Sequence, residues 1–495
     1  MNILTQLQRA RQALVNRRTK IVATVGPASD SPEVLEALIK AGVNVFRQNF
    51  SHGTHESHAA LYANIRATAD KLGEHVAILA DLCGPKIRVG HFKDGAIELT
   101  EGQQVTVTVR DVEGEPGLIP SEYEALANDV KPSDRLLLDD GRRELRVVSV
   151  EGTEIRCEVV RGGRLSNRKG INLPGVEISA PSLTDKDRAD AVFASELGVD
   201  FMALSFVRHQ TDVYALKQLL QEHGRVIPII SKIEKPEALD HIEGILAASD
   251  GIMVARGDMG VEMAAEEVPL IQRELTQLAI EHNTAVIVAT QMLESMIRNP
   301  TPTRAEVTDV AWAAMAGADA VMLSGETAAG DHPVDAVQTM DRVLRLVEGH
   351  QFHHDRFGGL IEHTTAATDE ATADLQLSEA LARGTAQLSR ELSARAIAVC
   401  SYTGHTAHMI SAERPAAPIL ALTANASTAR RLAIYWGVRP DLATDAEMND
   451  PIQPTLTRVR RFEMTDPDAH QFVLLVTGGR NEQERLAPGI KILMS

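Results

Sequence analysis

Short runs of branched apolar residues recur along the first 330 residues, and polar residues follow each run. A run of four to six such residues is typical of a strand buried on both faces, as in a parallel sheet. The runs occupy residues 21–25, 43–46, 76–80, 201–206, 226–230, 251–254, 285–289 and 320–323. The pattern therefore predicts eight parallel strands.

Helical patterns separate these strands. Ser31 with Pro32 is a start signal, an N-cap followed by a first-turn proline. Thr184 with Asp187 has capping-box spacing before another apolar periodic stretch. Eight strands alternating with helices predict a (β/α)8 TIM barrel, in which the active site lies at the carboxyl ends of the strands. A doubly wound sheet is the alternative, but it would not bring so many strand ends together.

Two regions depart from this alternation. Residues 90–172 show period-two patterning with Gly and Asp turns, which predicts an inserted all-β lid domain at 89–173. Beyond residue 346 the character changes again, and runs at 396–400, 419–422 and 472–476 predict a C-terminal α/β domain at 347–495. The barrel would then comprise residues 1–88 and 174–346.

The composition limits the partners. The chain has 495 residues and a net charge of −18, so nucleic acids and anionic membrane surfaces would be repelled. The three cysteines lie far apart without metal-ligand spacing, which is typical of reduced thiols. No apolar stretch approaches the length of a signal peptide core or a membrane span. We therefore expect a cytoplasmic protein, in which an anionic substrate needs a local cationic pocket.

The fifth and sixth predicted strands end in charge. Lys232 and Glu234 follow one strand and Asp258 follows the next. Two carboxylates with open neighbouring positions suit Mg2+ (or Mn2+) bound together with phosphate oxygens, and Lys232 would lie beside the metal as a point charge. A surface ion pair between Lys232 and Glu234 is the simpler alternative, and such pairs contribute little to stability.

Other strand ends supply groups suited to phosphate chemistry. Arg47 and Arg88 carry planar donors that match phosphate oxygens, and Thr290 and Ser324 carry hydroxyls that could relay a proton. The turn at 256–258 precedes a possible short helix, whose free amides could hold a carboxylate. Cations, a metal and backbone donors around one group are the components of phosphoryl transfer. The sequence contains no Walker motif or kinase glycine-rich loop.

The chain that carries these residues closely resembles the pyruvate kinases over nearly its whole length. No single segment is decisive, but together they are specific. The matching segments are residues 24–29, 47–53, 229–234, 253–262, 289–296 and 322–327.

The resemblance implies conversion of phosphoenolpyruvate and ADP to pyruvate and ATP, with roles for individual residues. Lys232 would stabilise the phosphoryl group in flight, Glu234 and Asp258 would bind the metal, and Thr290 and Ser324 would belong to the route that protonates the enolate. The lid would close over the site and exclude water. The resemblance further implies that substrate is bound by Arg47, Lys232, Gly257, Asp258 and Thr290, and nucleotide by Asn49, His52, Arg88 and Lys169.

One departure from the family concerns K+. Many members hold this ion with the equivalents of Asn49, Ser51, Asp81 and a threonine, near a glutamate. Here the threonine position is Leu82 and the glutamate position is Lys86. A fixed ammonium would repel a second cation. We therefore expect that Lys86 replaces K+, which is then not required; the alternative is that Lys86 faces solvent or a nucleotide phosphate.

The resemblance also implies regulation and assembly. Members often bind a phosphorylated effector in a loop equivalent to Ser401, Thr403, Gly404 and Thr406, assisted by a loop containing Arg480. His405 and Gly479 differ from the fructose-bisphosphate-activated members, which favours another sugar phosphate or AMP. The family is usually a homotetramer.

Two other functions stay open on the sequence. A metal-dependent lyase or aldolase that acts on pyruvate enolates could use the same barrel and carboxylates, but would not need the lid, Lys232 or the arginines. A non-catalytic, effector-binding relative would be expected to have lost Lys232, Glu234 or Thr290, and all three are present.

Overall fold

The computed structural model describes residues 16–353, 370–466, 469–477 and 489–495. Its centre is a closed barrel of eight parallel strands in the order β1-β16-β15-β14-β13-β12-β3-β2. This confirms the predicted TIM barrel. The strands are β1 (Lys20–Thr24), β2 (Val45–Asn49), β3 (Ala77–Asp81), β12 (Phe201–Leu204), β13 (Ile229–Ile233), β14 (Gly251–Ala255), β15 (Ala285–Ala289) and β16 (Ala320–Leu323).

Helices surround the barrel because their apolar faces pack on the outward side chains of the strands, in one large core. Ser31 and Thr184 cap α2 and α5 as predicted. The helices are α2 (Pro32–Ala41), α3 (His55–Leu72), α5 (Asp185–Leu197), α6 (Gln210–Glu222), α7 (Pro236–Asp240), α8 (Ile242–Ala248), α9 (Arg256–Glu262), α10 (Val268–Glu281), α11 (Arg304–Met315), α12 (Gly325–Ala328) and α13 (Pro333–His353), with the 3-10 helix η1 (Glu294–Ile297).

The positions of two strands, β2 and β13, differ from those predicted. β2 and β13 each begin two or three residues later than expected, so Arg47, Asn49 and Lys232 lie within strands rather than after them. Val226, predicted to start a buried strand, is 79% exposed. Apolar content alone misplaced these strands, because the polar side chains near their ends belong to the strand as well.

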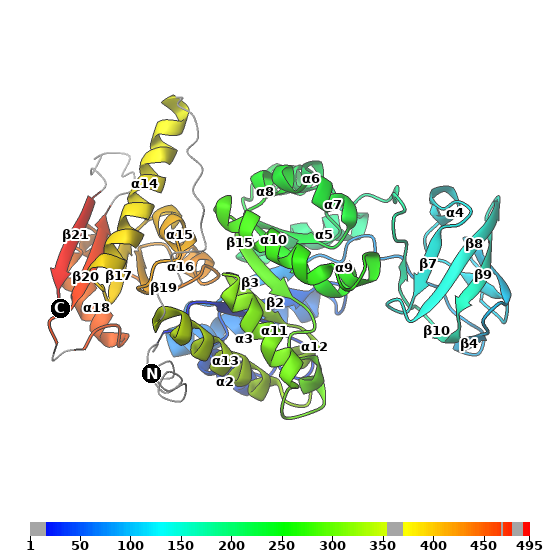
Figure 1. Cartoon of the computed structure of the whole chain (residues 1–495), viewed down its shortest axis with the longest axis horizontal. Helices are drawn as coiled ribbons and strands as arrows, with labels where there is room; N and C mark the ends of the chain where they lie inside the picture. Colours follow the sequence, from blue (N-terminus) through cyan, green and yellow to red (C-terminus); the bar gives the residue numbers. More distant parts are fainter. Residues whose placement is uncertain (1–15, 354–369, 467–468, 478–488) are drawn as a thin grey trace.

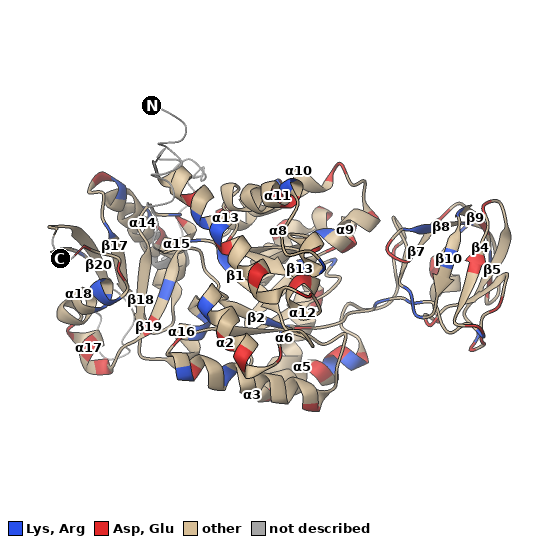
Figure 2. Ribbon diagram, turned by 90° about the horizontal axis from the view of Figure 1, so that it is seen from below, with Lys and Arg blue, Asp and Glu red and all other residues tan. Residues whose placement is uncertain are grey.

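The lid is inserted between β3 and α5, and it has its own apolar core. It stands off one end of the barrel, joined by two chain crossings (Figures 1 and 2). One sheet has the order β11-β7-β8-β9-β5-β6 and a second pairs β10 with β4. The elements are β4 (Ala96–Leu99), β5 (Gln104–Thr108), β6 (Leu118–Pro120), α4 (Leu126–Asp129), β7 (Arg135–Leu138), β8 (Arg143–Glu151), β9 (Glu154–Arg161), β10 (Gly163–Ser166) and β11 (Ile171–Asn172).

The C-terminal domain covers the opposite end of the barrel (Figure 1). Its sheet has the order β19-β18-β17-β20-β21, with only β21 antiparallel. The sequence pattern missed β19 and β21. The elements are α14 (Glu370–Glu391), β17 (Ala396–Cys400), α15 (His405–Ala412), β18 (Ile419–Thr423), α16 (Ala426–Leu432), β19 (Val438–Leu442), α17 (Asp445–Asn449), α18 (Ile452–Arg461), β20 (Phe472–Thr477) and β21 (Gly489–Met494).

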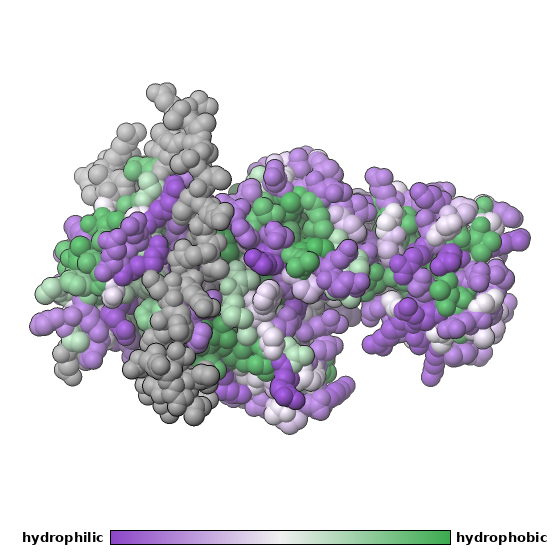
Figure 3. Space-filling view, viewed as in Figure 1, coloured by the Kyte–Doolittle hydropathy of each residue, from purple (hydrophilic) through white to green (hydrophobic). Residues whose placement is uncertain are grey.

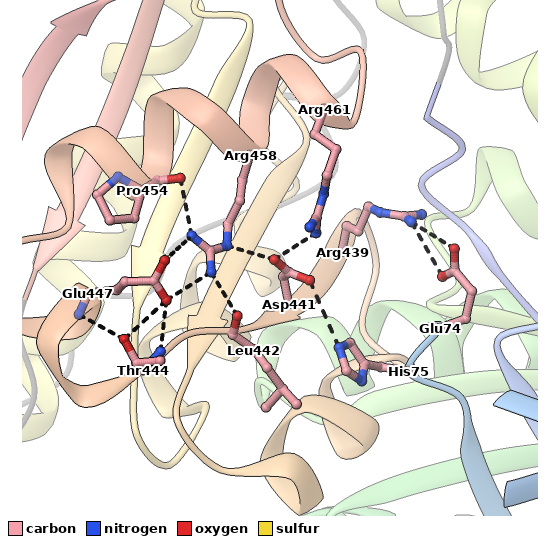
Figure 4. Close-up of polar contacts among 10 residues, drawn as sticks. All are labelled: Glu74, His75, Arg439, Asp441, Leu442, Thr444, Glu447, Pro454, Arg458 and Arg461. Atoms are coloured by element: carbon pink, nitrogen blue, oxygen red, sulfur yellow. Dashed lines mark hydrogen bonds and ion pairs between the residues drawn. The ribbon is translucent and has the colours of Figure 1, made fainter. Parts of the chain in front are cut away.

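The C-terminal domain enters the floor of the barrel. Ile434, just after α16, is fully buried in the cluster of side chains that fills the barrel interior, and Tyr435 packs against it. Close by, Arg439 pairs with Glu74 at 3.0 Å, and Asp441 is held by Arg458 at 2.7 Å (Figure 4). The amino ends of the strands are therefore sealed by another domain, and the carboxyl ends face the lid.

The face of the molecule seen in Figure 3 is mostly polar where its residues are described. Hydrophilic residues cover most of the visible face of the barrel and the lid, with hydrophobic residues in smaller patches (Figure 3). Within the described residues, no helix is long and apolar enough to cross a bilayer.

Candidate active site

A largely buried lysine lies at the carboxyl end of β13, surrounded by groups at the ends of three strands. Lys232 Nζ is 2.9 Å from Glu234 Oε1 and 3.5 Å from Asp81 Oδ1, and it donates a hydrogen bond to Ser205 Oγ at 2.7 Å. The Lys232 side chain is 12% exposed and that of Glu234 is fully buried. The pair is therefore not a surface ion pair, and that alternative is wrong. Burying such charges costs several kcal/mol unless they are compensated, so the groups around them need an explanation.

Arg47 joins the same cluster from β2. Its Nε donates to Asp81 Oδ2 at 2.5 Å and its Nη1 donates to Thr24 Oγ1 at 3.0 Å. Its Nη2 makes no hydrogen bond within the described residues. Asp81 thus orients two cations at once, and the Nη2 group of Arg47 stays available for a ligand.

The electrostatics follow from this packing. Burial alone would lower the pKa of Lys232, but the carboxylates of Asp81 and Glu234 outweigh it and raise that pKa above its usual value. Burial would raise the pKa of Asp81, but Arg47 and Lys232 hold it below its usual value. Lys232 and Asp81 therefore remain charged at neutral pH.

Glu234 and Asp258 fit a divalent cation. Burial raises the pKa of Glu234, and the negative charge of Asp258 raises it further against the opposing effect of Lys232. Glu234 Oε2 accepts from Phe206 N at 2.8 Å, while the buried Oε1 accepts no well-aligned hydrogen bond. Two nearby carboxylates, with one Glu234 oxygen held only by its ion pair with Lys232, suit Mg2+, which takes one or two carboxylates plus substrate oxygens. Within the described residues no group of three His, Cys, Asp or Glu side chains forms a fuller metal cage.

Thr290 follows β15 in a left-handed conformation, with φ 69°, and Gln291 has φ 54°. Thr290 Oγ1 accepts from Gly257 N at 2.7 Å, and Thr290 O accepts from Arg256 Nη2 at 2.6 Å. Arg256 and Gly257 begin α9 itself, so the predicted turn before that helix is its first turn. Because the hydroxyl oxygen is an acceptor here, its hydrogen is free to be donated elsewhere.

Ser324 follows β16 and starts α12. Its backbone N–H donates to Glu326 Oε2 at 2.7 Å, and its hydroxyl makes no hydrogen bond within the described residues. The structure therefore places Lys232, Glu234, Asp258, Thr290 and Ser324 at or just beyond the carboxyl ends of neighbouring barrel strands.

Three predicted residues form the exit of β2. Asn49 Oδ1 accepts from Ser51 N at 3.1 Å, and His52 is exposed, with its carbonyl oxygen 2.9 Å from His58 Nε2. Phe50 stacks on His58 with ring centroids 4.0 Å apart. His58 thus fixes the loop through His52 O and Phe50, while the His52 side chain stays accessible.

Arg88 and Lys169 lie at the lid and not in the Arg47 cluster. Arg88 Nη1 donates to Arg168 O at 2.9 Å, and Lys169 Nζ is 2.8 Å from Asp139 Oδ1 in the β7–β8 turn. Within the described residues no hydrogen bond or ion pair joins either cation to Lys232 or Arg47. A nucleotide could contact the Arg88 and Lys169 pair together with the Lys232 and Arg47 pair only if it lay between the lid and the barrel.

Lys86 is exposed and lines a small cavity at the base of the lid, together with Lys235 and Asp258. Across the described residues, it makes no ion pair with Asp81. Leu82 is 1% exposed and packs in the barrel core. The lysine therefore lies outside the Asp81 cluster and faces solvent, as in the alternative considered from the sequence, and Asp81 is neutralised by Arg47 and Lys232.

The predicted effector loop follows β17 and leads into α15, as expected. Ser401 is buried and its Oγ accepts from Gly404 N at 3.0 Å, while Thr403 Oγ1 accepts from His405 N at 3.4 Å. Gly404 has φ 86°, a conformation that favours glycine. Thr406 lies in the first turn of α15. Arg480 lies outside the described residues.

Sequence reasoning missed several residues that hold the site. Ser205 receives the Lys232 hydrogen bond and donates to Leu82 O at 2.7 Å. The sequence predicts Arg256 only as part of a turn, yet it also pairs with Asp309 at 2.6 Å. Ser205 follows the apolar strand β12, and its position at a strand exit was the available signal.

Comparison with known proteins agrees with this geometry. The family model "Pyruvate kinase, barrel domain" matches residues 16–337, and "Pyruvate kinase, alpha/beta domain" matches residues 379–480. The chain is 45% identical to the pyruvate kinase of Corynebacterium glutamicum over 94% of both chains. It is 45% identical to that of Staphylococcus saprophyticus, over 94% of this chain and 78% of the relative, and 41% identical to that of Mycobacterium tuberculosis, over 94% and 95%. The chain belongs to the pyruvate kinase family, phosphotransferases that form pyruvate and ATP from phosphoenolpyruvate and ADP.

Proposed function

We propose that this reaction takes place at the carboxyl ends of β2, β3, β13, β15 and β16, with Lys232 as its central cation. The observation that supports this proposal most directly is a largely buried ammonium, that of Lys232, held by Asp81, Glu234 and Ser205 at the carboxyl ends of the barrel strands. A fixed ammonium stabilises the charge spread over a phosphoryl group in transfer without having to reorganise. Arg47, with one free donor, would bind the phosphate of phosphoenolpyruvate.

Glu234 and Asp258 would hold Mg2+ or Mn2+, with Gly257 and Thr290 beside the substrate. The bound cation would supply positive charge to the phosphoryl oxygens and align them. Transfer breaks the bond between phosphorus and the enol oxygen and forms a bond to an ADP oxygen. The Thr290 and Ser324 hydroxyls, whose hydrogens are not committed within the site, would then relay a proton to the enolate carbon.

Asn49, His52, Arg88 and Lys169 would bind the nucleotide, two from the exit of β2 and two from the lid and the segment that joins it to the barrel, where Arg88 bridges to Gly170. Closing of the lid would bring the two pairs together around ADP and exclude water, which could otherwise accept the phosphoryl group. Removal of both lid cations, Arg88→Ala with Lys169→Ala, should therefore raise the KM for ADP more than the KM for phosphoenolpyruvate. Equal increases of the two KM values in steady-state assays would contradict the assignment of Arg88 and Lys169 to the nucleotide.

We propose further that K+ is not required. Leu82 offers no side-chain oxygen, Asp81 is neutralised by two protein cations, and Lys86 adds positive charge at the lid base. The test is pyruvate formation with Mg2+ in tetramethylammonium buffer, with and without K+. Full activity without K+ is expected. Activity only with K+ would overturn this proposal, and no activity in either buffer would overturn the assignment of the reaction.

The loop of Ser401, Thr403, Gly404 and Thr406 would bind the phosphate of a sugar phosphate or AMP. Hydroxyls and a glycine bend before α15 support this proposal. Thermal-shift titrations with ribose 5-phosphate, glucose 6-phosphate, fructose 1,6-bisphosphate and AMP test it. At least one should raise the melting temperature, since a ligand that binds only the folded state stabilises it; no shift with any of the four would reject it.

A homotetramer is the assembly that we propose. β21 is an edge strand with Ile492 52% and Met494 62% exposed, and α11 exposes Trp312 and Met315. Two separate apolar faces allow two kinds of contact between copies, as a closed tetramer requires. Light scattering of Ile492→Asp should show a smaller particle than the parent, and an unchanged mass would exclude that face.

The cellular location that we propose is the cytoplasm. Cys83, Cys157 and Cys400 are all unpaired, as in a reducing compartment. Fractionation of the source cells with an antibody to the protein tests this directly.

A further inference from the structure

A second buried ion pair lies beside the proposed metal ligands. Lys235 Nζ donates to Glu262 Oε1 at 2.7 Å, and the two side chains are 5% and 1% exposed. The described residues give Glu262 Oε2 no hydrogen-bond partner. A pair buried this completely costs desolvation energy that its own attraction only partly returns. Its stability alone therefore does not explain its presence.

The pair connects the two elements that carry the metal ligands. Lys235 directly follows Glu234 at the end of β13, and Glu262 lies four residues after Asp258 on α9. Residues four apart lie on the same face of a helix. Lys235, Asp258 and Glu262 line one cavity, so the pair and Asp258 face the same space.

The lid reaches the same carboxylate. Asn172 Nδ2, in β11 of the lid, donates to Glu262 Oε1 at 3.1 Å. The β7–β8 turn of the lid also approaches α9 at Val261, because a Cβ added at Gly141 would lie 3.6 Å from Val261 Cγ1. The helix that carries Asp258 is thus held by the barrel through Lys235 and by the lid through Asn172.

We propose that Lys235 and Glu262 are positioning residues for the metal site, which hold the Glu234 and Asp258 carboxylates at a fixed separation before the metal binds. The proposal rests on the assignment of those two carboxylates as metal ligands. Without a brace, two like charges at the ends of different elements would move apart. Groups that orient metal ligands typically change metal affinity 10- to 100-fold when removed.

Charge alone makes the opposite prediction for one of the two residues. Lys235→Met removes a cation close to the metal carboxylates, so simple attraction would tighten metal binding. Glu262→Gln removes an anion and would weaken it. Positioning requires that both substitutions weaken binding, because each breaks the same bridge.

The experiment is titration of the full-length protein with Mn2+ in the absence of substrates, with free Mn2+ followed by electron paramagnetic resonance. We expect both Lys235→Met and Glu262→Gln to raise the Kd about tenfold. Lys93→Met and Glu115→Gln, which break an exposed Lys–Glu pair of the lid, are the matched controls and should leave the Kd unchanged. Unchanged or tighter binding by Lys235→Met would overturn the proposal.

Two further pairs of variants keep the test decisive. If the first two variants fail to fold, Lys235→Arg keeps the bridge and should keep the Kd within about threefold, whereas Glu262→Asp shortens it and should weaken binding. A Glu262→Asp protein that is folded and binds like the parent would reject positioning. Glu234→Gln and Asp258→Asn should abolish binding; if they do not, the metal-ligand assignment is wrong, which is a different failure.

Discussion

The two ends of the barrel both contain buried charges, but the charges have different partners. At the amino ends, Asp319 Oδ1 accepts from Trp436 N at 3.0 Å and its Oδ2 accepts from Arg414 at 2.9 Å and from Val286 N at 3.1 Å. At the carboxyl ends, Asp81 Oδ1 and Glu234 Oε1 have ion pairs but no well-aligned hydrogen bond.

This difference distinguishes buried carboxylates that hold the fold together from those that can bind a ligand. Where every oxygen of a buried carboxylate is used by the protein, the charge joins elements together. Where a buried carboxylate oxygen is paired only through the charge of a cation, it can still accept a bond from a ligand, and such a bond is favourable because an unsatisfied buried group is costly. The comparison predicts that substitutions at the carboxyl ends change rate, and that those at the amino ends change stability.

The largest effect should come from Lys232→Met. Loss of the cation at the transferred group should lower kcat at least about 10³-fold, as with other preorganised charges. Pyruvate formation measures this, with folding checked by circular dichroism. Lys217→Met, at a half-exposed pair with Asp250, should keep the parent rate. A comparable loss in the control, or a Lys232→Met protein with near-native kcat, would break the comparison.

Arg414→Met tests the opposite end. It leaves Asp319 buried with one partner fewer, which typically costs about 3 kcal/mol. The melting temperature should fall, while kcat at 25 °C should stay at the parent value. Arg298→Met, at an exposed pair with Asp331, should leave the melting temperature unchanged. A fall in kcat without a loss of stability would show that the amino ends also serve the reaction directly.

Thr290→Ala should lower kcat about 10²-fold if its hydroxyl relays a proton. Thr290→Ser keeps the hydroxyl and should retain the rate within about threefold. Incorporation of deuterium at the methyl carbon of pyruvate, compared with ATP formation, shows whether protonation is the slowed step. Equal slowing of both would place Thr290 in phosphoryl transfer instead.

The double variant Leu82→Thr with Lys86→Glu sharpens the comparison at the cation region. It installs the residues of the K+-dependent members at both positions and replaces the positive charge at the lid base by a carboxylate, so activity should become dependent on K+ by about tenfold, since close unit charges change binding by at least 1 kcal/mol. Rates with and without K+ measure this. Equal rates of the double variant with and without K+ would show that these two positions do not determine the K+ dependence.

Lys20 offers the smallest test, at the amino ends. Burial, with Arg17 and Arg439 adding to it, lowers the pKa of Lys20 to about 7, and its Nζ donates to Val438 O at 2.6 Å. Between pH 7 and 9 the unfolded chain binds more protons at this site, so stability rises with pH. Relative to Lys20→Met, the parent should gain about 1 kcal/mol per pH unit, and thermal melts of both proteins measure it. If the stability difference between the parent and Lys20→Met does not change between pH 7 and 9, Lys20 stays charged in the folded protein.

Much of the architecture could be predicted from the sequence because parallel strands buried on both faces leave long apolar runs. All eight barrel strands were found, but β2 and β13 were misplaced, since Arg47 and Lys232 are strand residues that point at a site rather than into a core. β19 was missed because Arg439, Pro440 and Asp441 interrupt its apolar pattern.

The site was predicted from types of residue, and its organisation was not. Lysine and carboxylates at strand ends pointed to a metal and a phosphoryl group. The bridge between Lys235 and Glu262 and the hydrogen bonds of Ser205 join positions 27 or more residues apart. Such contacts depend on how the strands are ordered around the barrel, which no local pattern encodes.

The closure of the barrel has a consequence for synthesis. β1 pairs with β2 on one side and with β16 on the other, so the first strand made must wait for residues 320–323 before its second edge is covered. At about 5–20 residues per second, this interval lasts at least about 15 seconds. Ile434, which fills the barrel floor, leaves the ribosome later still. The lid, with its own core, can fold during that delay, so it should be the first part of the nascent chain to resist a protease.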